Sequence, residues 1–428
     1  MKRASDRIVR VVGADDVNLK RLRTLERYRE YEFKPLFTEA EVKGDVDRPL
    51  PELAQIALER LRDEPPAGVI AYWDFPANGL AHYVRGLLGL PGPTLESVLR
   101  CSHKYWARTT EVTVSPECVP SFEPLDPFET DAISEVSLEL PFWIKPVKAT
   151  GSALSFHVTT AAEARDALRV IRADISTFAR SFNHLLSVAR VPPWVRRVDG
   201  YHCIVESPLT GVQCTVSGFV HDGQVVMLGI VDSNTYPDTS AFRSFVYPSR
   251  LDEATQQELL RRADQMIRPF GLNESGFNIE FFVDGDSGQL GLLEVNPRFS
   301  QSHAELYSRV DGTSNHQLLV DLATGNDPHV RRREGRYQVA AKFFLRVFCD
   351  VLITSVPDAR TLDRIRRTYD CEIVLFAGAG DRLTHVATED VHCHDVAQVY
   401  LGASDYREAE RTYETIVREM NIGIEELS

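Results

Sequence analysis

Residues 276–298 read GFNIEFFVDGDSGQLGLLEVNPR and carry the strongest structural signal in the chain. Two apolar stretches flank the segment Asp284–Gly288, whose aspartates and glycines are typical of a tight turn. This pattern predicts a β-hairpin. Paired positions of a hairpin lie at equal distances from the centre of the turn, so a turn centred on Ser287 places Glu280 opposite Glu294.

The facing carboxylates of this hairpin predict a metal site. Glu280 and Glu294 would share a face of the hairpin with Asn296, two residues further on. Like charges that face each other destabilise a sheet, which favours a cation between them. Carboxylate and amide oxygens suit Mg²⁺ that also holds phosphates. The alternative is an acidic, solvent-exposed face, but the apolar neighbours Phe281 and Leu292 favour a buried setting.

The composition is that of an ordinary globular protein with an acidic balance. The 428 residues are 43% hydrophobic and 26% charged, which excludes collagen-like and disordered chains. At about 150 residues per domain, this length predicts two to four domains. The net charge of -14 argues against a protein that binds a nucleic acid backbone.

The chain carries no pattern that predicts membrane insertion or export. We find no apolar run near 18 residues, and residues 1–16 lack the apolar stretch of a signal peptide. Seven widely spaced cysteines without a CxxC pair favour thiols in a reducing compartment. We therefore expect a cytoplasmic protein that binds no membrane.

Strand and helix patterns alternate in the first hundred residues. Apolar runs predict strands, and apolar positions repeated every three or four residues predict helices. Strands are expected at 7–12 and 68–74, and helices at 17–31, 52–62 and 80–90. This alternation predicts a parallel α/β layer.

The rest of the chain follows a different pattern. Before the hairpin, strands are expected at 140–147, 201–206, 212–220 and 224–230, and helices at 161–178 and 251–270. After about residue 330, strands are expected at 340–348, 371–378 and 396–404, and a helix at 406–420. We therefore expect three domains, at residues 1–100, 101–330 and 331–428.

Two lysines, Lys104 and Lys145, are candidates for binding phosphate. Lys145 lies near the end of an apolar strand, and the small residues of Gly151–Ser155 follow. A lysine at such a position can reach a nucleotide phosphate while backbone N–H groups hold the rest of the phosphates. Lys104 is a weaker candidate, and either lysine alone is also compatible with an ordinary exposed side chain.

Taken together and in this order, the motifs resemble the ATP-grasp superfamily from about residue 7 to residue 330. The segment 206–213, ESPLTGVQ, is similar to the hinge that binds adenine in that family. The resemblance implies nucleotide contacts from Lys104, Lys145, Ser152, Glu206, Leu209 and Gln213, metal contacts from Glu280, Glu294 and Asn296, and a catalytic role for Arg298. It also implies a three-part α/β and α+β fold: an N-terminal parallel α/β domain, a lid at about 140–210 with a metal-binding platform, and a small C-terminal α/β unit.

Within the superfamily the chain resembles carboxylate–amine ligases such as L-amino-acid ligases, with an architecture similar to that of biotin carboxylases. The resemblance implies an ADP-forming reaction in which a carboxylate takes the γ-phosphoryl group of ATP and an amine then displaces phosphate from the acylphosphate. The implied cofactors are ATP and two Mg²⁺ (or Mn²⁺) ions. The implied partners are a small carboxylic acid and an amine, amino acids among them, with a homodimer as the expected assembly.

Three departures from the family pattern bear on the reaction. The phosphate loop at 148–158 has one glycine where many relatives have several, and Gln213 stands where relatives often have a glutamate. Ser300 and Ser302 occupy the spacing at which biotin carboxylases carry a glutamine and a glutamate, which argues against a biotin carboxylase. Two alternatives stay open: an ATP-grasp carboxylase or nucleotide-biosynthesis ligase, and a non-catalytic ATP-binding module.

Substrate contacts are harder to predict than nucleotide contacts. The segment 229–251 lies between the hinge and the hairpin, and residues 303–307 follow the reacting arginine. Each polar residue there is individually more typical of an ordinary loop or helix start. As a group they are the substrate candidates: Asp232, Tyr236, Arg243, His303 and Tyr307.

Overall fold

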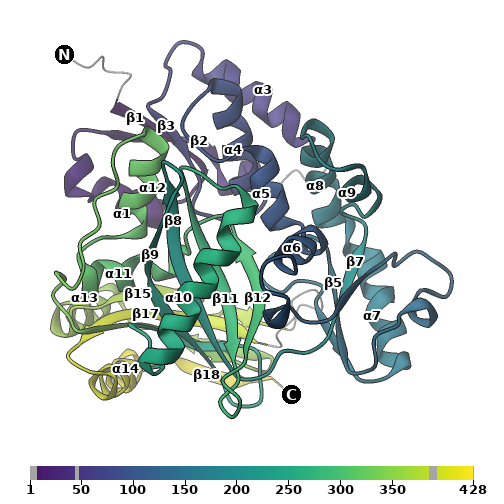
Figure 1. Ribbon diagram of the computed structural model, residues 1–428. Helices are drawn as coiled ribbons and strands as arrows, with labels where there is room; N and C mark the ends of the chain where they lie inside the picture. Colours follow the sequence, from purple (N-terminus) through teal and green to yellow (C-terminus); the bar gives the residue numbers. More distant parts are fainter. Residues whose placement is uncertain (1–6, 44–47, 385–392, 428) are drawn as a thin grey trace.

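The computed structural model describes residues 7–43, 48–384 and 393–427 (Figure 1). The N-terminal part is a parallel three-stranded sheet in the order β2-β1-β3, as the alternating pattern predicted. Its elements are β1 (Ile8–Ala14), α1 (Asp16–Arg23), β2 (Glu32–Thr38), α2 (Glu39–Lys43), α3 (Leu50–Leu61), β3 (Gly68–Ile70) and α4 (Ala77–Leu88). Leu53 and Leu80 pack in the core that α3 and α4 form against this sheet.

A second unit is a four-stranded sheet in the order β4-β7-β5-β6. Its elements are β4 (Phe122–Leu125), β5 (Phe142–Pro146), β6 (Phe156–Val158), α7 (Ala161–Asp174), α8 (Ser176–Val188), α9 (Pro193–Arg197) and β7 (Cys203–Glu206). Leu168 and Ile171 of α7 pack against Ile144 and Val205 of the sheet. This unit corresponds to the expected lid.

The largest sheet has eight strands in the order β12-β11-β8-β9-β10-β13-β17-β15, and each neighbouring pair is antiparallel. Its strands are β8 (Val212–His221), β9 (Gln224–Thr235), β10 (Phe242–Tyr247), β11 (Ser275–Val283), β12 (Leu290–Asn296), β13 (Val339–Val347), β15 (Glu372–Leu375) and β17 (His394–Ala403). Strands from the C-terminal part therefore extend the sheet that carries the hairpin. The expected domain boundaries stay predictions.

Helices cover both faces of the large sheet. Leu259 and Met266 of α10 (Glu253–Ile267) pack with Phe277, and α10 lies in front of the sheet in Figure 1. Leu306 of α11 (Ala304–Asp311) and Leu318 of α12 (Asn315–Thr324) pack in a different core, with Phe219. In the C-terminal part, α13 (Ala359–Tyr369) and α14 (Tyr406–Met420) pack on the sheet, while β14 (Val351–Ser355), β16 (Arg382–Leu383) and β18 (Gly423–Glu426) form a small separate sheet.

The hairpin register is confirmed. Glu280 pairs with Glu294 and Asn278 with Asn296, and a bulge follows directly after Glu280. The Asp284 carboxylate accepts hydrogen bonds from the backbone N–H of Asp286 and Ser287, at 3.2 and 2.8 Å, which holds the turn. Local turn chemistry therefore sets the register that brings the two glutamates together.

Some helices differ in extent from the expectation, and others were not predicted. The helix expected at 17–31 ends at Arg23, and a 3₁₀ turn and the unexpected strand β2 follow. The helix expected at 161–178 is interrupted at Ile175. The helices α5 (Leu95–Ser102) and α6 (Lys104–Glu111) were not predicted; His103 caps α6 by accepting the Trp106 N–H at 3.2 Å, and histidine is not a usual capping residue.

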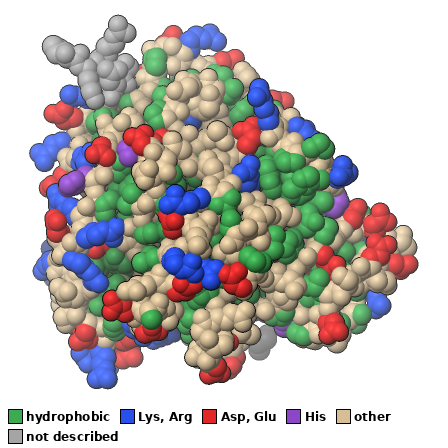
Figure 2. All heavy atoms as spheres, viewed as in Figure 1, with side chains coloured by type: hydrophobic (Ala, Val, Ile, Leu, Met, Phe, Trp, Pro, Cys, Tyr) green, Lys and Arg blue, Asp and Glu red, His purple; other side chains and the backbone are tan. Residues whose placement is uncertain are grey.

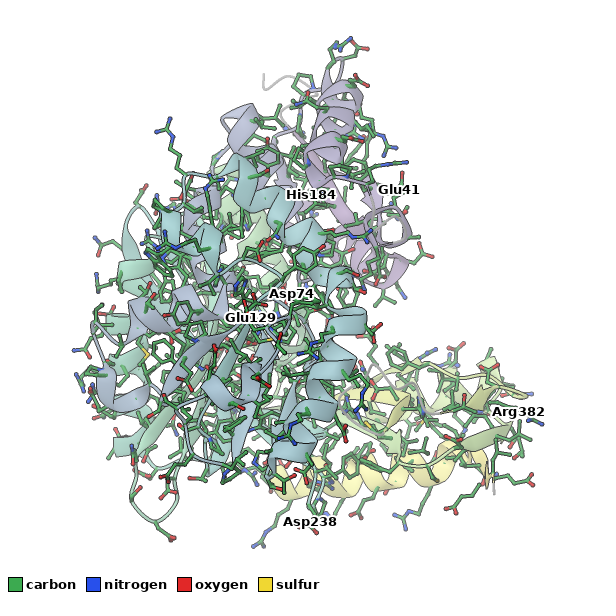
Figure 3. All side chains as sticks on the ribbon, turned by 90° about the vertical axis from the view of Figure 1, so that its right-hand side faces the viewer. Glu41, Asp74, Glu129, His184, Asp238 and Arg382 are labelled. Atoms are coloured by element: carbon green, nitrogen blue, oxygen red, sulfur yellow. The ribbon has the colours of Figure 1, made fainter. Side chains whose placement is uncertain are left out.

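The surface of the protein carries charged side chains of both signs (Figure 2). Figure 2 shows acidic and basic side chains interspersed over one face of the molecule. Figure 3 shows the C-terminal part, in yellow, with Arg382 at its edge and Asp74 near the centre of the molecule. Across the ranges that the structure describes, none of the helices is both long enough and apolar enough to cross a bilayer.

Helix α12 packs between the large sheet and the N-terminal sheet. Its Leu318 lies in the core of the large sheet, and its Val320 and Ala323 pack against Val9 and Ile70 of the N-terminal sheet. At this joint the His316 Nε2 atom lies 2.9 Å from the Asn18 side-chain oxygen. Burial, followed by the nearby Arg21, lowers the pKa of His316 to about 3. The joint therefore holds a neutral imidazole at neutral pH.

We expect His316→Gln to make stability less sensitive to acid. The unfolded chain takes up a proton near pH 6.5 and the folded chain does not, so the contribution of His316 is complete above about pH 6.5 and is lost as the pH falls toward about 3. Between about pH 6.5 and 5, the free energy of unfolding in urea should fall by up to about 1.4 kcal/mol less per pH unit in the variant than in the wild type. His329→Gln, at an exposed position, is the control; an unchanged slope in His316→Gln would contradict the assignment.

Candidate active site

A cavity of about 340 Å³ lies between the four-stranded sheet and the hairpin. We call it the lysine cavity, because Lys104, Lys145 and Lys148 line it. The structure brings into this one lining all ten residues that the sequence assigned to nucleotide, metal and catalysis: Lys104, Lys145, Ser152, Glu206, Leu209, Gln213, Glu280, Glu294, Asn296 and Arg298.

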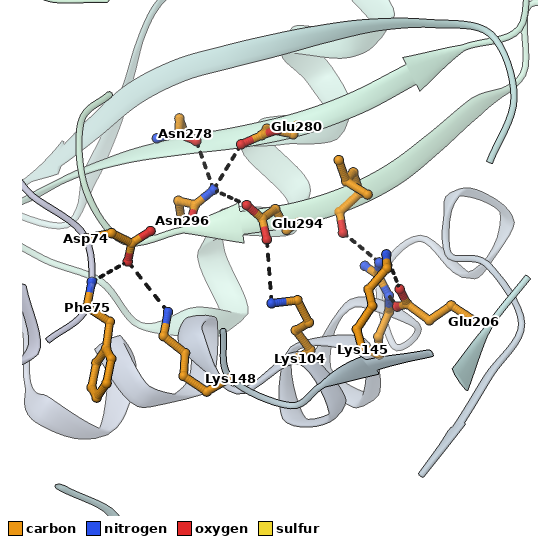
Figure 4. Close-up of polar contacts among 12 residues, drawn as sticks. Asp74, Phe75, Lys104, Lys145, Lys148, Glu206, Asn278, Glu280, Glu294 and Asn296 are labelled. Atoms are coloured by element: carbon orange, nitrogen blue, oxygen red, sulfur yellow. Dashed lines mark hydrogen bonds and ion pairs between the residues drawn. The ribbon is translucent and has the colours of Figure 1, made fainter. Parts of the chain in front are cut away.

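The two glutamates meet across a shared amide (Figure 4). Asn296 Nδ2 donates to Glu294 Oε1 at 2.9 Å and to Glu280 Oε1 at 3.2 Å. The other Glu280 oxygen accepts a hydrogen bond from Gln213 Nε2 at 2.9 Å. The sequence analysis expected the amide oxygen of Asn296 here. The amide nitrogen faces the two carboxylates instead, because only an N–H donor can form hydrogen bonds with both of them.

The electrostatics of the pair fit a divalent cation. Burial, and then the charge of Glu294, raises the pKa of Glu280 to about 8. Burial would also raise the pKa of Glu294, but Lys104 and the Asn296 hydrogen bond outweigh it and lower that pKa. A cation between the two carboxylates would relieve their repulsion, and the oxygen donors of the site are those that Mg²⁺ prefers.

Glu206 anchors one end of the lysine cavity. Its buried carboxylate accepts hydrogen bonds from Lys145 Nζ at 2.9 Å and from Arg108 Nε at 2.5 Å. Arg108 also donates to Glu111 at 2.7 Å and to the Leu293 carbonyl at 2.6 Å. The Glu206 carboxylate is therefore committed to these two cations, and it holds Lys145 in place beside the hairpin. The sequence analysis missed Arg108, although it lies one helical turn after Lys104 on α6.

The hinge segment depends on one glycine. Gly211 has a φ of +111°, and a Cβ there would lie 2.1 Å from the Val283 carbonyl oxygen. Leu209 lies against Gly291, where a Cβ would come within 2.7 Å of its Cδ2. Only a glycine allows the hinge to approach β11 this closely, which places Leu209 at the cavity wall.

The phosphate loop has a left-handed backbone. Gly151, Ser152 and Leu154 have φ values of 61°, 60° and 57°. Ser152 and Leu154 adopt this conformation although they carry side chains, at a cost of about 1 kcal/mol or more each. The loop therefore takes a turn that glycines would take freely, although Gly151 is its one glycine. Lys148, which the sequence analysis missed, begins the loop.

Arg298 is held by the N-terminal part. Its Nη2 donates to Asp74 Oδ2 at 2.7 Å, and Lys148 Nζ lies 3.6 Å from Asp74 Oδ1. Burial would raise the pKa of Asp74, but Arg298 and Lys148 outweigh it and hold that pKa well below the usual range. Asp74 lies 224 residues from Arg298, so no spacing in the sequence could link the two.

A second cavity of about 310 Å³ adjoins the first. We call it the aromatic cavity; Tyr72, Trp73, Phe75, Phe242 and Phe245 line it, together with Ser302 and His303. The two cavities share Asp74, Thr150, Gly151, Phe242, Glu280 and Arg298. Arg298 and Glu280 therefore stand where the cavities meet.

Of the five substrate candidates, only His303 belongs to the described lining of either cavity. The other four are engaged elsewhere, because their polar atoms already have partners. Asp232 accepts hydrogen bonds from Ser249 and Arg250, Tyr236 donates to the Phe344 carbonyl, Arg243 pairs with Glu410, and Tyr307 lies 3.5 Å from the Gly229 carbonyl. The five substrate contacts stay predictions, and His303 is the one of them that the structure places in the lining of a cavity.

Comparison with known proteins agrees with this geometry. The family model described as ATP-grasp domain matches residues 138–305, which include the phosphate loop, the hinge and the hairpin. The chain contains an ATP-grasp domain. This confirms the family resemblance that the motifs carried.

Solved structures extend the likeness to the whole chain. L-amino acid ligase from Bacillus licheniformis is 15% identical with a TM-score of 0.76, covering 98% of both chains. Biotin carboxylase from Campylobacter jejuni is 14% identical with a TM-score of 0.65, covering 98% of this chain and 92% of that one. At such identities the likeness shows the fold, so the expected three-part ATP-grasp fold is confirmed.

Among curated proteins, a carbamoyl phosphate synthase large chain from Nostoc is 31% identical over 107 residues. This match spans 25% of the present chain and 9% of that large chain. The match supports the assignment of the ATP-grasp domain.

We expect Arg108→Met to destabilise the protein strongly. The variant leaves Glu206 and Glu111 buried without their shared cation, and breaking a buried ion pair in this way costs about 3–5 kcal/mol. The free energy of unfolding in urea measures the effect. Arg169→Met, which removes an exposed arginine paired with Asp166, should change it by less than about 0.5 kcal/mol. Equal effects of the two substitutions would contradict a role for the buried network.

Proposed function

We propose that this protein is an ATP-dependent, ADP-forming ligase that joins a carboxylic acid to an amine through an acylphosphate. The observation that carries the proposal is the meeting of the two cavities at Arg298 and Glu280. Lysines and paired carboxylates suited to ATP and Mg²⁺ line one cavity, and the other offers room for an organic substrate. The proposed partners are a small acid, a small amine, ATP and two Mg²⁺ (or Mn²⁺) ions.

The lysine cavity would bind the nucleotide. Lys104, Lys145 and Lys148 would neutralise phosphate charge, and the left-handed loop would present backbone N–H groups to the phosphates. Glu280, Glu294 and Asn296 would hold the metal, which supplies charge neutralisation at the transferring phosphoryl group. Turning the Asn296 amide so that its oxygen faces the two carboxylates would complete the ligand set.

Arg298 would act where the phosphoryl group moves. In the proposed step a carboxylate oxygen of the acid attacks the γ-phosphorus, the bond to ADP breaks, and ADP leaves. The amine then attacks the acyl carbon, phosphate leaves, and the amine loses a proton. Arg298, oriented by Asp74, would donate hydrogen bonds to the developing negative charge. The work of the chain is positioning and charge stabilisation, so no side-chain nucleophile is required.

A substrate screen tests the proposal. The protein is incubated with ATP, Mg²⁺ and mixtures of carboxylic acids and amines, including amino acids, and released ADP and phosphate are measured. Mass spectrometry then identifies the product. An amide product supports the ligase; turnover that requires bicarbonate indicates a carboxylase; and tight ATP binding without turnover indicates a binding module.

We expect Glu294→Gln to reduce ATP turnover by about 100-fold or more, because the metal site loses a charged ligand that stabilises the transition state. Turnover at saturating ATP and Mg²⁺ measures the effect, and circular dichroism checks the fold. Glu334→Gln makes the same change at a side chain that is 63% exposed and should leave turnover unchanged. Wild-type turnover in Glu294→Gln would remove this residue from the metal site.

We expect Arg298→Lys to separate binding from chemistry. Lysine keeps the charge but loses the planar, two-pronged donor geometry, so ATP affinity should stay within about threefold while kcat falls by about 10²–10³. Nucleotide affinity and turnover are measured on the same variant, with Arg169→Lys as the exposed control. If kcat were unchanged, Arg298 would have no part in the chemistry; if ATP binding were lost, it would belong to the nucleotide site.

A further inference from the structure

Five aromatic side chains contribute to the walls of the aromatic cavity, beside polar residues such as Ser233 and Gln301. Tyr72, Trp73 and Phe75 come from the segment after β3, and Phe242 and Phe245 come from β10. The polar side-chain atoms of Tyr72 and Trp73 both form hydrogen bonds with Asp15. The Asp15 N–H donates to the Tyr72 hydroxyl at 3.0 Å, and Trp73 Nε1 donates to the Asp15 carboxylate at 2.9 Å. These rings therefore offer a ligand apolar surface.

One end of the aromatic cavity is cationic and has hydrogen-bonding capacity to spare. Arg298 and the buried His303 line it, and His303 Nδ1 has no hydrogen-bond partner among the described residues. Burial, and then the charges of Lys342 and Arg298, lowers the pKa of His303 to about 3, so its ring is neutral. A neutral imidazole beside the Arg298 guanidinium suits a ligand that brings its own negative charge.

Lys342 contributes to this end through Ser302. Its Nζ is buried and donates to Ser302 Oγ at 3.0 Å. When Lys342 is protonated it can only donate, which leaves the Ser302 hydroxyl proton for a ligand in the cavity, although burial lowers the pKa of Lys342 to about 7. Arg298, His303 and Ser302 together form what we call the cationic end.

The carboxylates of the cavity argue for an acid rather than an amine as its ligand. Among the described lining residues, the carboxylates are Asp74 and Glu280. Asp74 pairs with Arg298 and Lys148, and Glu280 accepts hydrogen bonds from Asn296 and Gln213. Both are engaged, so an ammonium group would find neither of them free, whereas a carboxylate would find the cationic end.

We infer that the aromatic cavity binds the acid substrate and selects carboxylic acids that carry an aromatic ring or a large apolar group. This inference rests on the proposed ligase function. The carboxylate would lie at the cationic end, next to the residues that the two cavities share, and the apolar group would lie among the aromatic walls. Phe242 and Phe245, whose ring centroids are 4.9 Å apart, supply one part of that wall.

Binding measurements test the selectivity without requiring turnover. Calorimetry on protein saturated with Mg²⁺ and a non-hydrolysable ATP analogue compares 3-phenylpropanoate with propanoate, which differ only by the ring. Burial of the ring should make 3-phenylpropanoate bind about 10–100-fold more tightly. Equal affinities, or tightest binding of the dicarboxylate succinate, would overturn the inference.

Variants locate the effect in the cavity. Phe242→Ala should weaken 3-phenylpropanoate binding about tenfold and leave propanoate binding nearly unchanged. Ser302→Ala should weaken binding of both acids by a similar factor, because the carboxylate of each would lie at the cationic end. Phe128→Ala removes a phenylalanine that is 52% exposed on the surface and should change neither. A Phe242→Ala variant that kept the full preference would place the ring elsewhere and refute the inference.

Turnover separates this inference from the proposed function. A preference for 3-phenylpropanoate in binding, without ADP release for any acid and amine, would refute the ligase and leave the selectivity intact. ADP release that is fastest with small or charged acids would support the ligase and refute the selectivity.

Discussion

The facing of Glu280 and Glu294 across the hairpin is the constraint on which the rest of the site depends. Burial, and then the repulsion between the two half-buried carboxylates in register, raises the pKa of Glu280, and the Asn296 amide donates hydrogen bonds to both carboxylates. Lys104 completes the arrangement at 4.0 Å from Glu294. The repulsion between the two carboxylates favours a cation at this site, because a metal ion between them would neutralise their charge.

Two buried ion networks hold other elements around this pair. Arg108 and Lys145 meet on Glu206, which ties α6 and the four-stranded sheet to the hairpin through the Leu293 carbonyl. Asp74 ties the N-terminal part to Arg298 and to the start of the phosphate loop at Lys148. Each network places a cation that the proposed chemistry needs, and each does so with a carboxylate that is itself fully engaged.

The two cavities divide the proposed work between charge and apolar surface. The lysine cavity gathers cations and carboxylates, as binding of a polyphosphate and its metal requires. The aromatic cavity combines aromatic walls with polar groups, and in it the hydroxyl of Tyr72 and the indole N–H of Trp73 contact Asp15. Asp15 also caps α1 by accepting the Asn18 N–H, so the same residue shapes a helix start and a cavity wall.

Local sequence determined what depends on neighbouring residues. The turn at Asp284–Gly288 set the pairing of the glutamates, and the motif order gave the domain type and the ten residues of the lysine cavity, because each motif is short and its chemistry is local. Tertiary structure alone decided the contacts between distant segments: Asp74 with Arg298, Arg108 with Glu206, and Lys342 with Ser302. It also decided that β13 lies beside β10, which carries the C-terminal strands into the large sheet. No periodicity or spacing encodes such contacts, because they arise only when packed elements bring together side chains that lie far apart in the chain.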